Sequence, residues 1–171
     1  MIQYFKERDI EALGIACFGP IDLNKKSDTY GYITTTPKLA WVNYDIVGAF
    51  KKELNIPIGF DTDVNGSALG EATWGITQGL ENSIYITIGT GVGMGIITNG
   101  KLLHGMLHPE AGHMLLMMPL VRKEVKKQLN GYLKTKQLDD LENYIVLPSL
   151  NDNQGIMGCL KLALNEIEEN K

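Results

Sequence analysis

The sequence lacks the apolar segments that membrane and secreted proteins carry. No hydrophobic run reaches the roughly 18 to 20 residues that a membrane span requires, and the first residues, MIQYFKERDIEALG, contain no signal-peptide core. We therefore expect a cytoplasmic protein that makes no contact with a membrane.

Cysteine and clustered positive charge are also scarce. The two cysteines, Cys17 and Cys159, lie in apolar surroundings far apart in the sequence, which predicts buried, reduced thiols without a function. The chain has 16 basic and 20 acidic residues and a net charge of −4, and its basic residues never gather into a stripe longer than Arg122 to Lys127. Binding to nucleic acid is therefore not expected.

Internal repeats, low-complexity tracts and proline-rich linkers are absent too, and the composition is that of a folded chain. Of the 171 residues, 44% are hydrophobic and 21% are charged, which suits about one domain with a buried core. Glycine is the outlier, with 19 residues against an average usage near 7%. An excess of glycine indicates backbone in unusual conformations or in close approach to another group.

Apolar patterns along the chain change between strand-like and helix-like segments. Continuous or alternating apolar runs predict strands at 12–18, 57–60 and 144–147, a strand or extended loop at 30–36, and two strands joined by a glycine-dense turn within 82–97. Helical spacing predicts helices at 1–9, 45–55, 64–74, 119–132 and 154–167, the second of them capped by Asn43 or Asp45. This alternation predicts an α/β fold.

Two carboxylates follow the short strand predicted at 57–60. The segment Gly59-Phe-Asp-Thr-Asp-Val-Asn65 places Asp61 and Asp63 at the carboxyl end of that strand, where α/β sheets bind ligands. The two carboxylates are expected to share one face of the strand, with Thr62 pointing the other way. A carboxylate there could accept a proton from an attacking hydroxyl group. The alternative is that Asp61 or Asp63 only caps the helix that follows.

The segment Thr87-Ile-Gly-Thr-Gly-Val-Gly-Met-Gly95 has glycine at every second position between two predicted strands. Its N–H groups could converge on an anion such as phosphate, and Thr87 and Thr90 would add hydroxyl donors. It is neither a Walker A loop, since no Gly-Lys-Ser/Thr follows, nor a dinucleotide fingerprint, since a strand follows instead of a helix. A tight β-hairpin explains the pattern about as well.

Two further segments carry clustered polar residues. Leu107-His-Pro-Glu-Ala-Gly-His113 places Glu110 and His113 around a glycine, where both could reach one polar ligand. His104, His108 and His113 raise a metal hypothesis, but neither a cysteine-rich nor an HExxH spacing supports a complete zinc site. In Pro148-Ser-Leu-Asn-Asp-Asn-Gln-Gly155, short polar residues before the last helix suit either helix capping or a nucleotide contact.

Taken in order, the motifs of this chain resemble those of the ROK family of sugar kinases and repressors. They are Gly-Pro-Ile-Asp at 19–22, Asp-Thr-Asp-Val-Asn at 61–65 with Ala-Leu-Gly-Glu at 68–71, Thr-Ile-Gly-Thr-Gly-Val-Gly at 87–93 and Glu-Ala-Gly-His at 110–113. Within that family, residues 30–37 and 59–63 look most like the bacterial fructokinases. The resemblance runs from about residue 5 to 116 and again from about 119 to 164.

This resemblance implies an actin-like ATPase fold, ribonuclease H-like and of the hexokinase type, with two α/β lobes. It also implies transfer of the γ-phosphoryl group of ATP to a hexose with Mg²⁺, in a homodimer, with fructose converted to fructose 6-phosphate. By the match of motifs, Asp63 is the general base that takes the proton of the sugar hydroxyl. The matched sugar-binding positions are Gly19, Thr62, Asn65, Glu110 and His113, and the matched ATP- and phosphate-binding positions are Thr87, Gly89, Thr90, Gly91 and Gly155.

The chain departs from the family pattern at two places. Nothing before Phe5 supplies the glycine-rich Asp-x-Gly-Gly-Thr loop, and the cysteines of the family's Zn²⁺ module do not follow His113, which leaves this zinc ligand without its partners. We therefore expect an incomplete pair of lobes, with 1–82 from the first and 83–171 from the second, whose last helix closes the nucleotide side. The alternatives are a catalytically impaired fragment and a non-enzymatic sugar-binding or regulatory member. The motifs do not fix which hexose is used.

Overall fold

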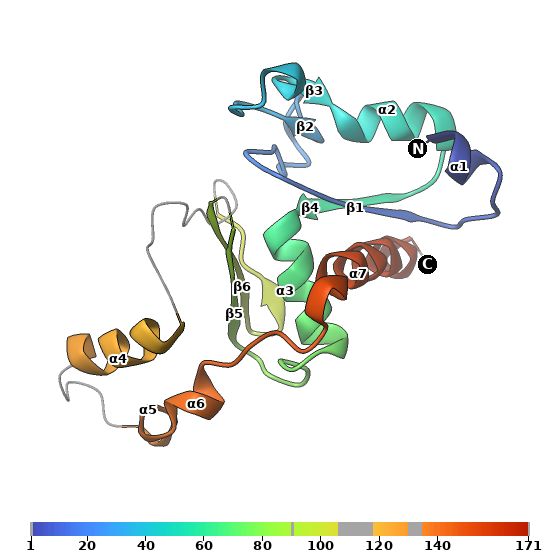
Figure 1. Ribbon diagram of the computed structural model, residues 1–171. Coiled ribbons are helices and arrows are strands. Elements are labelled where there is room, and N and C mark those ends of the chain that lie inside the picture. The colour runs from blue at the N-terminus through green and yellow to red at the C-terminus, as the bar shows by residue number, and fades with distance from the viewer. Residues whose placement is uncertain (1, 90, 106–117, 130–134, 171) are drawn as a thin grey trace.

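The computed structural model describes residues 2–89, 91–105, 118–129 and 135–170 of the chain (Figure 1). The strands are β1 (Leu13–Cys17), β2 (Tyr32–Ile33), β3 (Tyr44–Asp45), β4 (Ile58–Thr62), β5 (Ser83–Ile88), β6 (Val92–Thr98) and β7 (Lys101–Leu102). The α-helices are α1 (Ile2–Lys6), α2 (Ile46–Leu54), α3 (Asp63–Trp74), α4 (Met118–Leu129), α5 (Lys136–Asp139), α6 (Leu141–Tyr144) and α7 (Gln154–Glu169), and short 3₁₀ turns lie at Leu39–Trp41 and Asn151–Asn153. The α/β class predicted from the sequence is confirmed.

The strands of the described residues form three small sheets. β1 and β4 pair in parallel, in a register that runs from Leu13 opposite Ile58 to Cys17 opposite Thr62. β2 and β3 form a short antiparallel pair, and β5, β6 and β7 form an antiparallel sheet in that order. The carboxyl ends of β1 and β4 therefore lie side by side at one edge of this pair, the kind of edge where α/β sheets bind ligands.

The parallel pair β1–β4 lies between helix α2 and the C-terminal helix α7 (Figure 1). Every residue of β4 is buried, which suits a strand covered on both faces. The core on the α2 side is built from Leu13, Ile21, Ile33, Val47, Ile58 and Phe60. On the other side α7 packs against both strands and against α3, and α3 also packs against β5 and β6.

Glycines allow this packing to be close. A Cβ atom on Gly158 of α7 would lie 1.9 Å from the carbonyl oxygen of Gly66 in α3. A Cβ on Gly59 of β4 would lie 2.4 Å from the carbonyl oxygen of Leu162. These contacts confirm that part of the glycine excess serves close approach of one backbone to another.

Three of the predicted helices are confirmed with nearly their expected bounds. They are α2, α3 and α7, and the cap of α2 is Asp45, whose carboxylate accepts from Gly48 N at 2.7 Å. The helix expected at 119–132 corresponds to α4. Among the described residues, no helix is long and apolar enough to cross a membrane.

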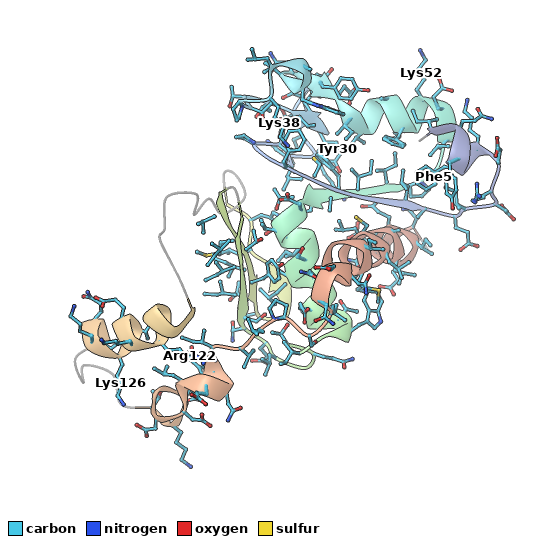
Figure 2. The ribbon with its side chains drawn as sticks, viewed as in Figure 1. Phe5, Tyr30, Lys38, Lys52, Arg122 and Lys126 are labelled. Atoms are coloured by element: carbon cyan, nitrogen blue, oxygen red, sulfur yellow. The ribbon has the colours of Figure 1, made fainter. Side chains whose placement is uncertain are left out.

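The strand predicted at 144–147 is wrong. Tyr144 ends helix α6, and Ile145 N donates to the carbonyl of Leu141 in a helical manner. The Ile145 carbonyl accepts from the guanidinium of Arg122 at 2.6 and 3.2 Å. Figure 2 labels Arg122 on α4. Tyr144 and Leu147 are exposed, so the apolar run that suggested a buried strand is not buried here.

The division of the chain into lobes at 82 and 83 stays a prediction. Helix α3 precedes this point and packs against β5 and β6, which follow it.

Candidate active site

The turn from β4 into α3 is fixed by its own side chains. The Thr62 hydroxyl caps α3 by accepting from Asn65 N at 3.1 Å, and Asp63 is the first helical residue. The cap is therefore Thr62 and not one of the two carboxylates, which corrects the alternative drawn from the sequence. A carboxylate in the first turn also complements the positive end of the helix dipole.

Asp61 and Asp63 do not share a face, contrary to the expectation. The strand alternation ends at Thr62 because Asp63 already has helical geometry. Asp61 is 3% exposed, whereas Asp63 is exposed to solvent. Only Asp63 is therefore accessible to a substrate in this structure.

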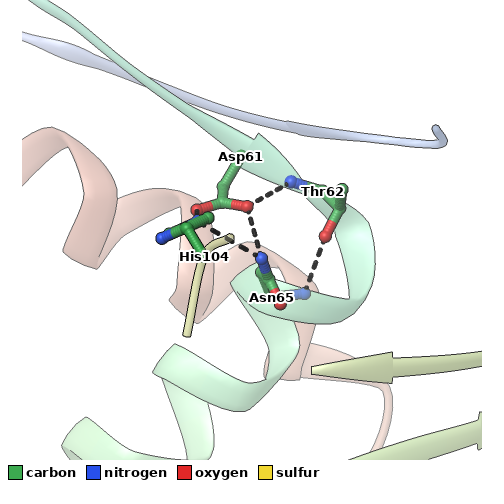
Figure 3. A network of polar contacts seen from close by, with 4 residues as sticks. All are labelled: Asp61, Thr62, Asn65 and His104. Atoms are coloured by element: carbon green, nitrogen blue, oxygen red, sulfur yellow. Dashed lines mark hydrogen bonds and ion pairs between the residues drawn. The ribbon is translucent and has the colours of Figure 1, made fainter. Parts of the chain in front are cut away.

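Asp61 lies at the centre of a polar network behind this turn (Figure 3). Its Oδ1 accepts from Thr62 N and from Asn65 Nδ2, both at 2.7 Å. Its Oδ2 lies 2.8 Å from Nε2 of His104, which follows β7. Asn65 is fully buried and its Oδ1 has no hydrogen-bond partner among the described residues, while Thr62 is 2% exposed. Neither side chain offers surface to a sugar here, so their predicted contacts with sugar hydroxyls stay predictions.

Asp63 opens onto a small hollow between α3 and β5. Its volume is about 90 Å³, and it is lined by Asp63, Val64, Ser67, Tyr85 and Thr87. The structure thus brings together the candidate base and one of the candidate phosphate-binding residues, which come from different motifs. Carboxylate and hydroxyl groups of this kind can position a second hydroxyl group and accept its proton.

The glycine-dense segment forms the β5–β6 hairpin. Ile88 pairs with Val92, and Gly89 N donates to the Gly91 carbonyl at 2.9 Å. Gly89 and Gly91 are exposed, and a Cβ on either would meet open space. The hairpin reading of the motif is confirmed, while its binding of phosphate stays a prediction. Thr90 lies outside the described residues.

Two later glycines of the same segment serve packing. A Cβ on Gly93 would lie 2.6 Å from Val64 Cγ1, and a Cβ on Gly95 would lie 2.4 Å from the Val64 carbonyl oxygen. These glycines let β6 approach the first turn of α3, which carries Asp63.

The start of α7 lies beside the hollow. Gln154 Nε2 donates to the Tyr85 hydroxyl at 3.0 Å, and a Cβ on Gly155 would lie 3.9 Å from Ser67 Oγ. Asn153 makes no capping hydrogen bond with its side chain, so the polar residues before α7 are not explained by a cap at that position. Gly155, a candidate adenosine-side residue, therefore lies close to the hollow.

The loop before α7 is anchored on α3 by Glu71, which is 2% exposed. Its Oε1 accepts from Leu150 N at 2.8 Å, and its Oε2 accepts from Ile76 N, Ser149 N and Ser149 Oγ at 2.9 to 3.3 Å. One helix thus carries Asp63 at its start and holds the loop that leads to Gly155 near its end.

Gly19 follows β1 and precedes Pro20 in a cis peptide bond, at the same edge as Thr62. Glu110 and His113 lie outside the described residues, and so do the contacts predicted for them. Among the residues that the structure describes, no three His, Cys, Asp or Glu side chains gather as metal ligands.

The sequence did not reveal that Ser67, Tyr85 and His104 lie at this site. Ser67 lies one helical turn after Asp63, a spacing that could have identified it. The roles of Tyr85 and His104 depend on how β5 and β7 pack against α3, which no local pattern reports.

Burial and nearby charge shift two pKa values at this edge. The hydrogen bond with Asp61 raises the pKa of His104 above its ordinary value, and a hydrogen bond with the Leu102 backbone adds to this. Burial, with smaller effects from Asp63 and Asp61, raises the pKa of the Cys17 thiol to about 12. Cys17 and Cys159 are both free thiols, as expected, but both are half-buried instead of fully buried.

Comparisons with known proteins agree with this geometry. The model of the ROK family matches residues 1–119. A fructokinase of Streptococcus mutans serotype c is 48% identical over 163 residues, which cover 93% of this chain and 53% of the relative. Against the curated fructokinases that it matches, the chain spans between 39 and 53% of their length.

Two solved structures are similar to the chain. A ROK family glucokinase from Streptomyces griseus in complex with glucose and AMPPNP has a TM-score of 0.54 and 25% identity, with 74% of this chain and 46% of that chain covered. A ROK hexokinase from Thermus thermophilus has a TM-score of 0.64 at 18% identity, covers 93% of this chain and 80% of that one, and supports the fold alone. The actin-like, hexokinase-type fold is thereby confirmed.

Proposed function

Because the chain belongs to the ROK family, whose model matches residues 1–119, we propose that it transfers the γ-phosphoryl group of ATP to a hexose, with fructose as the sugar. Sugar phosphorylation is supported by the fructokinases among its relatives. ATP as the donor is supported by the glucokinase neighbour, whose bound AMPPNP is an ATP analogue. Because the chain spans about half the length of these relatives, the activity is proposed for the whole protein that contains it.

The observation that carries the proposal is the hollow between α3 and β5. It is lined by the exposed carboxylate of Asp63 together with Thr87, which lies next to the turn of the β5–β6 hairpin. Phosphoryl transfer needs no covalent intermediate with the protein, because positioning and charge stabilisation provide most of the rate enhancement. A base that adjoins the hydroxyl groups of Ser67, Tyr85 and Thr87 supports that kind of catalysis.

In the proposed reaction, Asp63 accepts the proton of the 6-hydroxyl group of fructose. The sugar oxygen forms a bond to the γ-phosphorus, the bond from that phosphorus to the β,γ-bridging oxygen breaks, and fructose 6-phosphate and ADP leave. Thr87, Gly89, Thr90 and Gly91 are proposed to bind the phosphates, and Gly155 the adenosine side. Gly19, Thr62, Asn65, Glu110 and His113 are proposed at the sugar side.

Mg²⁺ would neutralise charge on the phosphates of ATP during the transfer. The hollow offers one carboxylate and several hydroxyl oxygens, which are the hard ligands that this ion prefers. One carboxylate does not form an all-protein Mg²⁺ site, so the ion would be held mainly by the nucleotide. The ligands for Zn²⁺ do not come together among the described residues, and no step is assigned to it. A homodimer is proposed from the resemblance alone.

The assignment of the base is tested with Asp63→Asn. This variant keeps the shape of the side chain but cannot accept the proton, so we expect kcat to fall by about 10³-fold while fructose still binds. Asp139→Asn, on the exposed end of α5, is the matched control and should keep the wild-type rate. A rate for Asp63→Asn within twofold of wild type would contradict the assignment of the base. A preference for glucose or mannose over fructose would contradict the assignment of the sugar.

A second candidate is a sugar-binding or regulatory protein without kinase activity, which is favoured by two xylose repressors among the relatives, at 32 and 33% identity over 106 residues. Calorimetry distinguishes the two. Hexose binding without binding of AMPPNP at millimolar concentration would support the sugar-binding protein, and binding of both would support the kinase.

A further inference from the structure

Asp61 is a buried carboxylate that the proposed reaction does not use. It lies in β4 two residues before Asp63, and both of its oxygens are hydrogen-bonded (Figure 3). A buried carboxylate requires such donors, because an oxygen left without one costs free energy.

The donors to Oδ1 lie on either side of Asp63. Thr62 N and Asn65 Nδ2 each lie 2.7 Å from this oxygen, and Asn65 N in turn donates to the Thr62 hydroxyl at 3.1 Å. The two residues that flank the turn are therefore held to the same carboxylate. The direction in which the turn presents Asp63 depends on the orientation of Asp61.

The donor to Oδ2 comes from a distant part of the chain. His104 follows β7, its side chain is 38% exposed, and its Nε2 lies 2.8 Å from Oδ2. Since a carboxylate only accepts, Nε2 must carry the proton. With Oδ2 bound to the imidazole, Oδ1 stays directed at Thr62 and Asn65.

We propose that His104 is a positioning residue for Asp63, acting through Asp61. The imidazole fixes the Asp61 carboxylate, the carboxylate fixes the turn from β4 into α3, and the turn presents the base to the hollow. This proposal rests on the proposed function, because it gives His104 a part in the same reaction. His104 itself does not line the hollow.

The test compares His104→Phe with His104→Gln. Phenylalanine fills a similar space but has no donor for Oδ2, whereas glutamine keeps a neutral donor. We expect His104→Phe to lower kcat about 100-fold with the KM for fructose changed less than about twofold, since a misplaced base affects the transition state more than binding of the sugar. His104→Gln should recover most of the wild-type kcat. Equal kcat in His104→Phe and wild type overturns the proposal, and so does an equal loss in both variants.

Hydrogen exchange of backbone amides separates this proposal from the proposed function. In His104→Phe the Thr62 and Asn65 amides should exchange at least about tenfold faster than in wild type, while the Tyr85 amide in the β5–β6 ladder keeps its protection. In His104→Gln all three should behave as in wild type. Wild-type protein without kinase activity overturns the proposed function, whereas unchanged exchange at Thr62 and Asn65 in His104→Phe overturns the role of His104.

Discussion

At the scale of single residues, the site is organised by buried polar groups that never reach the solvent. Asp61 and Asn65 hold the turn from behind, and Glu71 holds the loop before α7. The exposed Asp63 between them is free to meet a ligand. Burial of these groups, with the hydrogen bonds described, fixes the turn and the loop on the same helix.

His104 should make the stability of the protein depend on pH. Its pKa in the folded state is raised above the ordinary 6.5 by Asp61, so the folded protein binds this proton more tightly than the unfolded chain. The resulting stabilisation is fully present below pH 6.5 and is lost as the pH rises through the raised folded-state pKa. His104→Gln removes the titrating group but keeps the hydrogen bond.

Urea unfolding at a series of pH values measures this effect. The free energy of unfolding of wild type minus that of His104→Gln should be largest under acidic conditions and should decrease towards alkaline pH. A difference that stays constant with pH, or one that increases with it, would show that Asp61 does not raise the pKa of His104 in the folded protein.

At the scale of elements, helices α3 and α7 meet through glycine. A Cβ on Gly158 would lie 1.9 Å from the Gly66 carbonyl oxygen, a backbone atom that cannot turn aside. Gly158→Ala should therefore move the two helices apart and lower the free energy of unfolding by about 3 kcal/mol. Chemical denaturation followed by circular dichroism measures this loss of stability.

Gly155→Ala is the matched control for this substitution. It lies in the same helix, where the nearest described atom to a Cβ would be Ser67 Oγ, at 3.9 Å. Alanine is also favoured over glycine in a helix, so the control should be neutral or stabilising by up to about 1 kcal/mol. Equal loss of stability in both variants would mean that the close crossing of α3 and α7 is not what Gly158 provides.

At the scale of the whole molecule, one face of the β5–β6–β7 sheet is apolar and exposed. Ile84, Ile86 and Ile88 alternate along β5 with side chains that face α3, and they are 38 to 59% exposed. Replacing Ile84 and Ile88 with threonine should lower the fluorescence of a hydrophobic dye about twofold and change the free energy of unfolding by less than about 1 kcal/mol. Ile97→Thr, at a position 2% exposed, should instead destabilise by about 3 kcal/mol. A double variant that loses as much stability as Ile97→Thr would show that this face is covered in solution.

The sequence predicted those parts of the molecule whose signal is local. Helix α2 has an apolar face and a capping aspartate, and β4 begins with the apolar residues Ile58-Gly-Phe60, so both were found. Asp61 and Asp63 were both candidates because they follow a strand at the ligand-binding edge. The choice of Asp63 came from the match of motifs, and its role stays a prediction. The separation of Asp61 from Asp63 was missed, because the change from strand to helix at Thr62 reverses the expected alternation. The strand at 144–147 was wrong because an apolar run does not reveal whether another element covers it.

The placement of α7 has a consequence for how the chain folds. β1 pairs with β4 and is covered by α7, so one face of β1 is buried only when residues 154–169 are present. Contacts of such sequence separation form late, because a long loop must close before they contribute. During synthesis on the ribosome, the apolar face of β1–β4 would therefore stay uncovered until α7 emerges, and the nascent chain is a natural client for chaperones over that interval.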